Sequence, residues 1–238
     1  MGTTFKTQII PAVLLAVSLA GCPTRPHAPS APGQPVLAPA HEGRPYEVVP
    51  DESLLTILVY RAGALAVAGH NHVIASHRLA GTVYVPSDPG RATFELRFAV
   101  ADLTVDEPAL RAKEASTDFP PDVPDSAKEG TRRNMLSEAL LDAAHSPQIV
   151  LRSERLERPA GGPEGNLVAH VQVSVRDQQR SLTAPVHYEL NADEVVASGE
   201  LPLKQTDLGL TPFSALLGAL QVQDEMKVRF RIVARATQ

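Results

Sequence analysis

Residues 166–190 place an apolar side chain at every second position over two consecutive segments, which are separated by a short polar turn at 176–179. A period of two puts one set of side chains on each face of a pleated strand. The stretch therefore predicts a β-hairpin with one apolar face and one water-facing face. Pro185 lacks an N–H group, so it needs an edge or a weakly paired position. The alternating residues are Leu167, Ala169, Val171, Val173, Val175, Leu182, Ala184, Val186, Tyr188 and Leu190.

The same alternation recurs at 93–100 and at 226–234. Further strand-like segments lie at 54–60, 71–75, 79–86, 148–155 and 195–206. Roughly eight strands, most of them antiparallel and joined by short turns, predict an all-β sandwich or closed barrel.

One interval interrupts the strands. Residues 107–115 predict a short helix, and 131–143 predict a longer one with Thr131 as its cap and Ser146-Pro147 after its end. Met135, Leu136, Ala139 and Leu140 give that helix an apolar stripe. One or two short helices inserted after the third or fourth strand are expected to cover an open end or edge of the sheet.

The N-terminal residues predict an export signal. Residues 9–20 form an apolar run that is short for a spanning helix and ends in Leu19-Ala20-Gly21-Cys22. This ending resembles the bacterial lipobox, which implies a leader at 1–21 and lipid attachment to Cys22. The alternative is an ordinary secretory peptide followed by a chance cysteine. Residues 22–47 are rich in Pro and Ala and predict a disordered tether, with one folded domain at 48–238.

Composition excludes several classes of function. The net charge is -5 and no Lys/Arg cluster appears, so nucleic acid is not an expected partner. Cys22 is the only cysteine, which excludes an intrachain disulfide and a multi-cysteine metal site. The sequence has no nucleophile elbow and no phosphate-binding Gly-rich loop. The acidic pair Asp106-Glu107 is interpreted as part of a solvated turn, and no enzyme activity is expected.

Several short pieces, taken in order, resemble the YceI-like family over about residues 48–236. The match rests on their order and spacing, since each piece is weak alone. The pieces are Asp51-x-Ser53, His72, Gly81-Thr82-Val83, Arg133-Asn134-Met135-Leu136, Leu141-Asp142, Ser146-Pro147-Gln148-Ile149 with Ser153, and Lys204-Gln205-Thr206-Asp207-Leu208-Gly209-Leu210.

The resemblance implies an eight-stranded, lipocalin-like antiparallel barrel with a long apolar cavity for polyisoprenoid or other lipid chains. This chain departs from the family at the hairpin turn, where only Arg180 of a Gly-x-Thr-Arg-like turn is kept. Val171 stands where the family usually has Gly, which is expected to narrow the lumen. The insert at 213–220 is placed to fold over the mouth.

The apolar faces of the predicted strands are the candidate ligand site. A cavity lined in this way favours an apolar chain, because burial contributes about 0.8 kcal/mol per CH2. The alternative is that the same side chains fill the barrel and leave an interaction module. The candidate lining residues are Phe94, Leu96, Phe98, Val173, Val186, Val228, Phe230 and Ile232, with Leu136 and Leu140 capping the cavity.

Gly69-His70-Asn71-His72 is the sharpest polar feature. On a strand His70 and His72 share a face, and the favoured interpretation places them at the barrel mouth, bonded to Asp51, Asp207 or a ligand headgroup. The alternative is a metal or haem site formed by His70, His72 and His77.

The sequence thus predicts non-enzymatic lipid or isoprenoid binding by an envelope lipoprotein on the periplasmic side. Pro23 after Cys22 favours the outer membrane of a Gram-negative cell by analogy. No cofactor is expected besides a bound isoprenoid or other lipid.

Overall fold

The computed structural model of the chain describes residues 2, 41–114 and 116–237. The predicted lipidation site Cys22, the leader apart from Gly2, and the tether as far as residue 40 lie outside the described residues. Residues Ala40–Gln238 form one compact unit. Among the residues described, none belongs to a helix that is both long and apolar enough to cross a bilayer.

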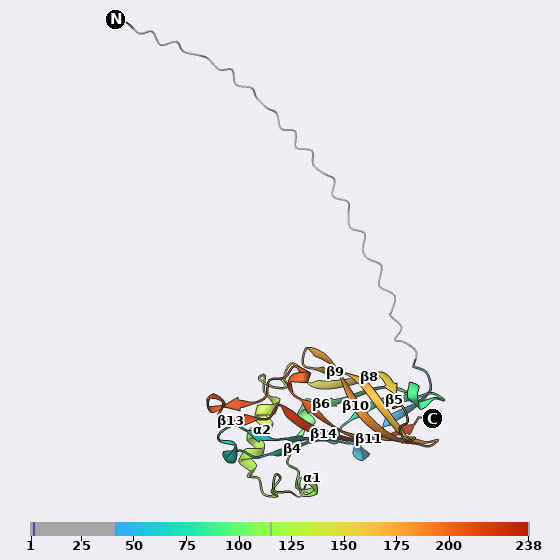
Figure 1. Cartoon of the computed structure of the whole chain (residues 1–238), viewed down its shortest axis with the longest axis horizontal. Helices are drawn as coiled ribbons and strands as arrows, with labels where there is room; N and C mark the ends of the chain where they lie inside the picture. The colour runs from blue at the N-terminus through green and yellow to red at the C-terminus, as the bar shows by residue number, and fades with distance from the viewer. Residues whose placement is uncertain (1, 3–40, 115, 238) are drawn as a thin grey trace. The chain divides into compact units, whose positions relative to one another are not determined.

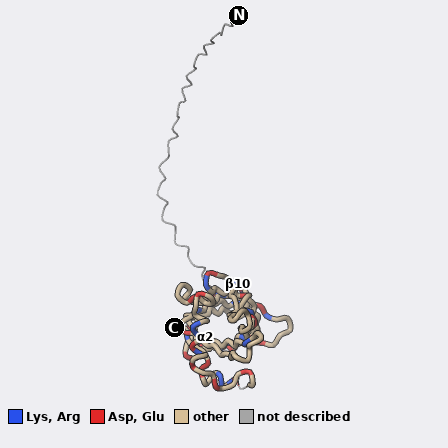
Figure 2. Tube along the Cα trace, turned by 90° about the vertical axis from the view of Figure 1, so that its left-hand side faces the viewer, with Lys and Arg blue, Asp and Glu red and all other residues tan. Residues whose placement is uncertain are grey.

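Strand β1 (Arg44–Val48) closes the sheet into a barrel. It pairs on one side with β5 (Ala80–Val85) and on the other with β14 (Glu225–Ala236), both antiparallel. The result is an eight-stranded antiparallel barrel, which confirms the predicted barrel and rules out the sandwich. Viewed end-on, the chain forms a ring (Figure 2). From β5 to β14 the ring runs through β6 (Thr93–Ala99), β8 (Gln148–Glu157), β9 (Asn166–Val175), β10 (Gln178–Leu190) and β11 (Glu194–Lys204).

Two positions in the ring are built from interrupted strands. Strand β2 (Leu54–Val59) follows β1 and pairs with the other half of β14, and β4 (His72–Ser76) pairs with β2 and leads into β5. The buried Ser53 hydroxyl lies at the first interruption, where it donates to the Val49 carbonyl at 2.8 Å and accepts from the Val233 N–H at 3.0 Å. A side chain thereby replaces ladder bonds that the break removes.

The hairpin that organises the sequence forms as predicted. β9 and β10 pair in register from Val175 and Gln178 to Asn166 and His187. The turn between them holds Arg176 with a φ of 54°. Pro185 has a ladder partner on β9, but the pairing of β10 with β11 stops at His187. Pro185 thus occupies the weakly paired position that it requires.

The longer of the two α-helices lies at one end of the barrel, which we call the mouth end, and the shorter one lies beside the barrel nearer the middle of its length (Figure 1). Helix α1 (Pro108–Lys113) matches the short predicted helix and follows the two-residue strand β7 (Thr104–Val105). Helix α2 (Asp125–Leu136) differs from the predicted 131–143: it begins directly after Pro124, and Ser137 leaves the helix with a ψ of 163°. The sequence-based placement was therefore wrong by nearly two turns.

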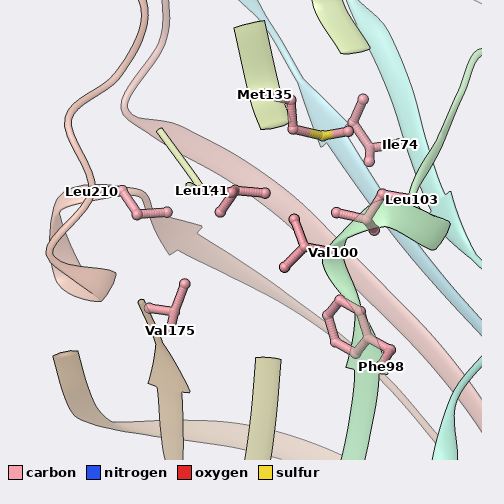
Figure 3. Packing of buried hydrophobic residues seen from close by; sticks show 8 residues of the cluster. All are labelled: Ile74, Phe98, Val100, Leu103, Met135, Leu141, Val175 and Leu210. Carbon is pink, nitrogen blue, oxygen red and sulfur yellow. The ribbon is translucent and has the colours of Figure 1, made fainter. Parts of the chain in front are cut away.

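A packed cluster joins α2 to the strand ends around it (Figure 3). Met135 of α2 lies near Ile74 and Leu103 in the close-up, and Leu141 lies between Leu210 and Val100. Burial of these side chains fixes the helix across the mouth end.

The opposite end, called the far end, carries the start of β1. Strand β1 begins at Arg44, so the barrel starts before residue 48, where the sequence had placed the domain boundary. Tyr46 and Val48 are buried and alternate with more exposed neighbours, as in a strand with one apolar face. The strand was missed in the sequence because it is short and directly follows the Pro-rich residues.

Candidate functional site

A cavity of about 550 Å³ runs inside the barrel from the far end to the mouth end. Each of the eight strand positions contributes to its wall, and nearly all wall side chains are aliphatic or aromatic. The volume falls in the range of small-molecule and lipid pockets, about 300–1,000 Å³. The barrel is therefore hollow rather than filled.

The structure places most of the predicted lining residues on this wall. Their role in holding a ligand stays a prediction. The wall contains Phe94, Leu96, Phe98, Leu140, Val173, Val186, Val228, Phe230 and Ile232.

Leu136 is the exception. It does not belong to the wall but packs beneath it, against the cluster that holds α2. Because α2 ends at Leu136, Ala139 and Leu140 lie beyond it and do not form the predicted stripe, and a different face of the helix points inward. That face has the spacing of an amphipathic helix, but sequence reasoning missed it because most of its members are small or polar. The inward residues are Ala127, Gly130, Thr131, Asn134 and Met135.

The hairpin supplies a large part of the wall. Val171, the residue expected to narrow the lumen, is buried and lies on the wall with Ala169 and Val173 beside it. The small side chains of Ala169 and Ala184, which face each other across the hairpin, leave room that larger residues would occupy.

Polar wall residues gather at the mouth end. His70 and His72 both reach the cavity, with ring centroids 6.0 Å apart. Arg61, Gln205 and Gln221 join them there. The cavity therefore has a polar end and a long apolar remainder.

The hydrogen-bond partners of His72 differ from those predicted. Its Nδ1 donates to Asp106 Oδ2 at 2.6 Å, and its Nε2 lies 2.9 Å from the Thr131 hydroxyl. Neither Asp51 nor Asp207 is a partner of this ring. A carboxylate only accepts hydrogen bonds, so the Nδ1–H group of His72 donates to Asp106, and the contact between Nε2 and the Thr131 hydroxyl completes the hydrogen bonding of the ring.

Asp106 is the main polar residue that sequence reasoning misjudged. Instead of lying in a solvated turn it is 1% exposed, with a positive φ of 53°. It also accepts from the Val73 N–H at 2.9 Å and from Arg111 Nη1 at 2.7 Å. The alternation of the flanking segments gave no signal for this, since the partners come from β4 and α1.

Arg111 is buried as well. Its Nη1 also donates to the Asn71 carbonyl at 2.9 Å, its Nε to the Pro120 carbonyl at 2.6 Å, and its guanidinium lies 5.6 Å from the ring centre of Phe119. We call His72, Asp106 and Arg111 the buried triad. It ties β4, α1 and, through Thr131, α2 to one another at the polar end of the cavity.

The triad sets the protonation of its surroundings. Burial opposes ionisation of Asp106, but the hydrogen bonds from His72 and Val73 and the charge of Arg111 outweigh it, so the pKa of Asp106 lies below its usual value. Burial, with added repulsion from His72 and Arg111, lowers the pKa of His70. The neutral form of His70 is thus favoured at the cavity mouth.

The three histidines of the metal alternative do not come together. His77 bonds Glu107 at 3.1 Å through Nε2, and both ring nitrogens of His72 are already engaged. Within residues 41–114 and 116–237, no group of three or more His, Cys, Asp or Glu side chains is arranged to hold a metal ion.

This geometry defines a class: small closed β-barrels with an internal apolar cavity that is polar at one end. The match to a family model is more specific, covering residues 46–234 with the YceI-like domain. The chain belongs to the YceI-like domain family.

Two solved structures are similar in fold. BcnA of Burkholderia cenocepacia is 16% identical, with a TM-score of 0.55 over 79% of this chain and 99% of its own. A polyisoprenoid binding domain from Saccharophagus degradans, implicated in plant cell wall breakdown, is 11% identical, with a TM-score of 0.51 over 81% of this chain and 98% of its own. Among curated proteins, none matches the chain significantly.

Proposed function

We propose that this chain is a lipid-anchored binding protein of the bacterial cell envelope that holds a polyisoprenoid or another long apolar chain inside its barrel. The observation that carries the proposal is the cavity of about 550 Å³ with its continuous apolar wall. Each methylene group moved from water into such a wall contributes about 0.8 kcal/mol.

The ends of the cavity suggest how the ligand is oriented. Charged, imidazole and amide side chains of the wall gather at the mouth end, near His70 and Arg61, so a lipid headgroup is favoured there and the tail along the hairpin. Family membership and the likeness to a polyisoprenoid binding domain support the same ligand class.

The leader and Cys22 supply the anchoring part of the proposal. A lipobox-like Leu19-Ala20-Gly21-Cys22 favours lipid attachment at Cys22, and Pro23 favours the outer membrane, on its periplasmic side. Mass spectrometry of the mature protein from bacterial membranes is expected to show a chain that begins at Cys22 and carries acyl groups. A water-soluble chain with a free Cys22 thiol would contradict the anchor.

The cavity is tested by blocking it. We expect organic extraction of the purified protein to release a co-purified lipid, and Val186→Trp to reduce its amount at least tenfold. Val186 lies on the wall, so the larger ring occupies the space of the ligand tail. Quantitative mass spectrometry of the extract measures the result.

His187→Trp is the matched control. His187 is the next residue of β10 and lies outside the cavity wall, where it bonds Asn166 on β9. This variant should retain the wild-type amount of lipid. If both variants keep their lipid, or if the wild type carries none and binds no added polyisoprenoid, the proposed function fails.

A further inference from the structure

Exposed apolar side chains are concentrated at one place on the barrel. Among the described residues, five large hydrophobic side chains are exposed, and four of them belong to two loops at the mouth end. These are Leu65, 44% exposed, Val67, 85%, Leu216, 66%, and Leu217, 109%.

The two loops form one structure. Strands β12 (Ser214–Ala215), β13 (Leu220–Val222) and β3 (Arg61–Ala62) pair into a small antiparallel sheet. The Leu65 N–H also donates to the Ala219 carbonyl at 2.7 Å. We call residues 62–69 and 213–222 the tip. β13 lies at the end of the molecule where α2 lies (Figure 1).

The tip lacks charge. Residues 62–69 and 208–223 contain no Asp, Glu, Lys or Arg, although 21% of the whole chain is charged. Arg61, which marks the base of the first loop, holds its guanidinium against the Gly69 carbonyl at 2.8 Å. An uncharged apolar surface can enter the acyl region of a bilayer, and a cation at its border can face the phosphate groups of the lipids.

The backbone of the tip holds its leucines outward. Leu216 and Leu217 both have positive φ, 51° and 56°, in the left-handed region that leucine seldom adopts. Gly218 follows with a φ of 88°. Two adjacent leucines in this conformation, one fully exposed, are not explained by packing within the barrel.

The tip is continuous with the cavity. Phe213, Leu220 and Val222 line the cavity, while Leu216 and Leu217, between them in sequence, face solvent. A lipid chain that passes between this cavity and a bilayer would therefore meet apolar side chains along the tip.

We propose that the tip inserts into the surface of a lipid bilayer and seats the mouth of the barrel on it. A bilayer is favoured over a protein partner because the exposed hydrophobic side chains of the tip are all aliphatic and lie on two narrow loops, whereas protein interfaces are enriched in aromatic anchors. The inference concerns the tip and holds whether or not the cavity carries lipid.

Site-specific tryptophan fluorescence of the full-length chain tests this insertion, because the chain contains no Trp. Leu217→Trp puts a single Trp at the most exposed position of the tip. On phosphatidylcholine vesicles with brominated acyl chains, we expect its emission to shift to the blue and to be quenched at least twofold. Since the tip is uncharged, the quenching should persist in 1 M salt, where the Debye length is about 3 Å.

Leu190→Trp is the matched control. Leu190 is the fifth exposed hydrophobic residue, 40% exposed, and ends β10 at the far end. Its emission should remain unshifted and unquenched, even where an acylated Cys22 holds the chain on the vesicle. Val67→Trp provides a second tip probe should Leu217→Trp fail to fold.

The outcomes are separable. Quenching at 217 or 67 but not at 190 supports docking through the tip. Equal quenching at both ends, or none at the tip, overturns it. Lipid that still co-purifies with a protein whose tip is never quenched would leave the proposed function intact and remove only this inference.

Discussion

The two ends of the barrel handle charge in opposite ways. At the far end, ion pairs such as Arg91–Glu42 at 2.7 Å and Arg44–Asp193 at 3.9 Å are exposed on the surface. At the mouth end, the triad of His72, Asp106 and Arg111 is buried, and the tip carries exposed apolar side chains and no charged residue.

The difference shows which end is adapted to water. Exposed ion pairs at the far end are solvated and contribute little to stability. At the mouth end a charge network is withdrawn into the protein, where it positions β4, α1 and α2 around the cavity entrance. The mouth end thus combines a buried charge network with an exposed apolar tip.

The largest expected effect comes from breaking the buried triad. Asp106→Asn leaves Arg111 buried without its counter-charge, which should lower the free energy of unfolding by about 3–5 kcal/mol. Urea denaturation of the variant measures this loss. Arg111→Met in the same protein should recover part of it, because the uncompensated charge is then absent.

Lowering the pH should reduce the free energy of unfolding gradually, and by less than Asp106→Asn does, because protonation of Asp106 weakens the same network. Because the folded-state pKa of Asp106 is lowered, its contribution to stability is present above the unfolded-state pKa of about 3.9 and is lost as pH falls through the folded value. Thermal unfolding followed from pH 6 to pH 2 should show a shallower decline for Asp106→Asn than for the wild type. If the stability of the wild type and of Asp106→Asn declined in parallel with pH, ionised Asp106 would not be what stabilises the mouth end.

The smallest effect is expected at the far end. Arg91→Gln removes a close ion pair, but both side chains are about two-thirds exposed, so the free energy of unfolding should change by less than about 1 kcal/mol. Urea denaturation under the same conditions provides the comparison. A loss here as large as that of Asp106→Asn would abolish the contrast between the ends.

The strands were predictable because the alternation of apolar and polar side chains within each strand shows which face is buried. In β9, Leu167, Val171 and Val175 face the cavity and their neighbours face outward, so the period of two is visible in the sequence itself. The same holds for β14, whose Met226, Ile232 and Ala234 are buried. Most of the cavity wall followed from these patterns.

The mouth end was less predictable because the positions of its residues depend on contacts with segments that are distant in the sequence. The inward face of α2 contains Gly130 and Thr131, which carry no apolar signal, and Thr131 is placed by its bond to His72 on β4. The stronger apolar stripe around Leu140 instead belongs to the turns after the helix, and it shifted the predicted helix toward the C-terminus.

The sequence by itself determined that this chain builds antiparallel sheet, as a sandwich or a closed barrel, since alternating apolar residues must bury one face of each strand. The family resemblance added the expectation of a hollow lumen. Only the tertiary structure decided that Asp106 is buried against Arg111, and that residues 62–69 and 213–222 meet in one uncharged tip. The reason is that a period is a property of neighbours along the chain, whereas an ion pair or a surface patch depends on which distant segments the closed sheet brings together.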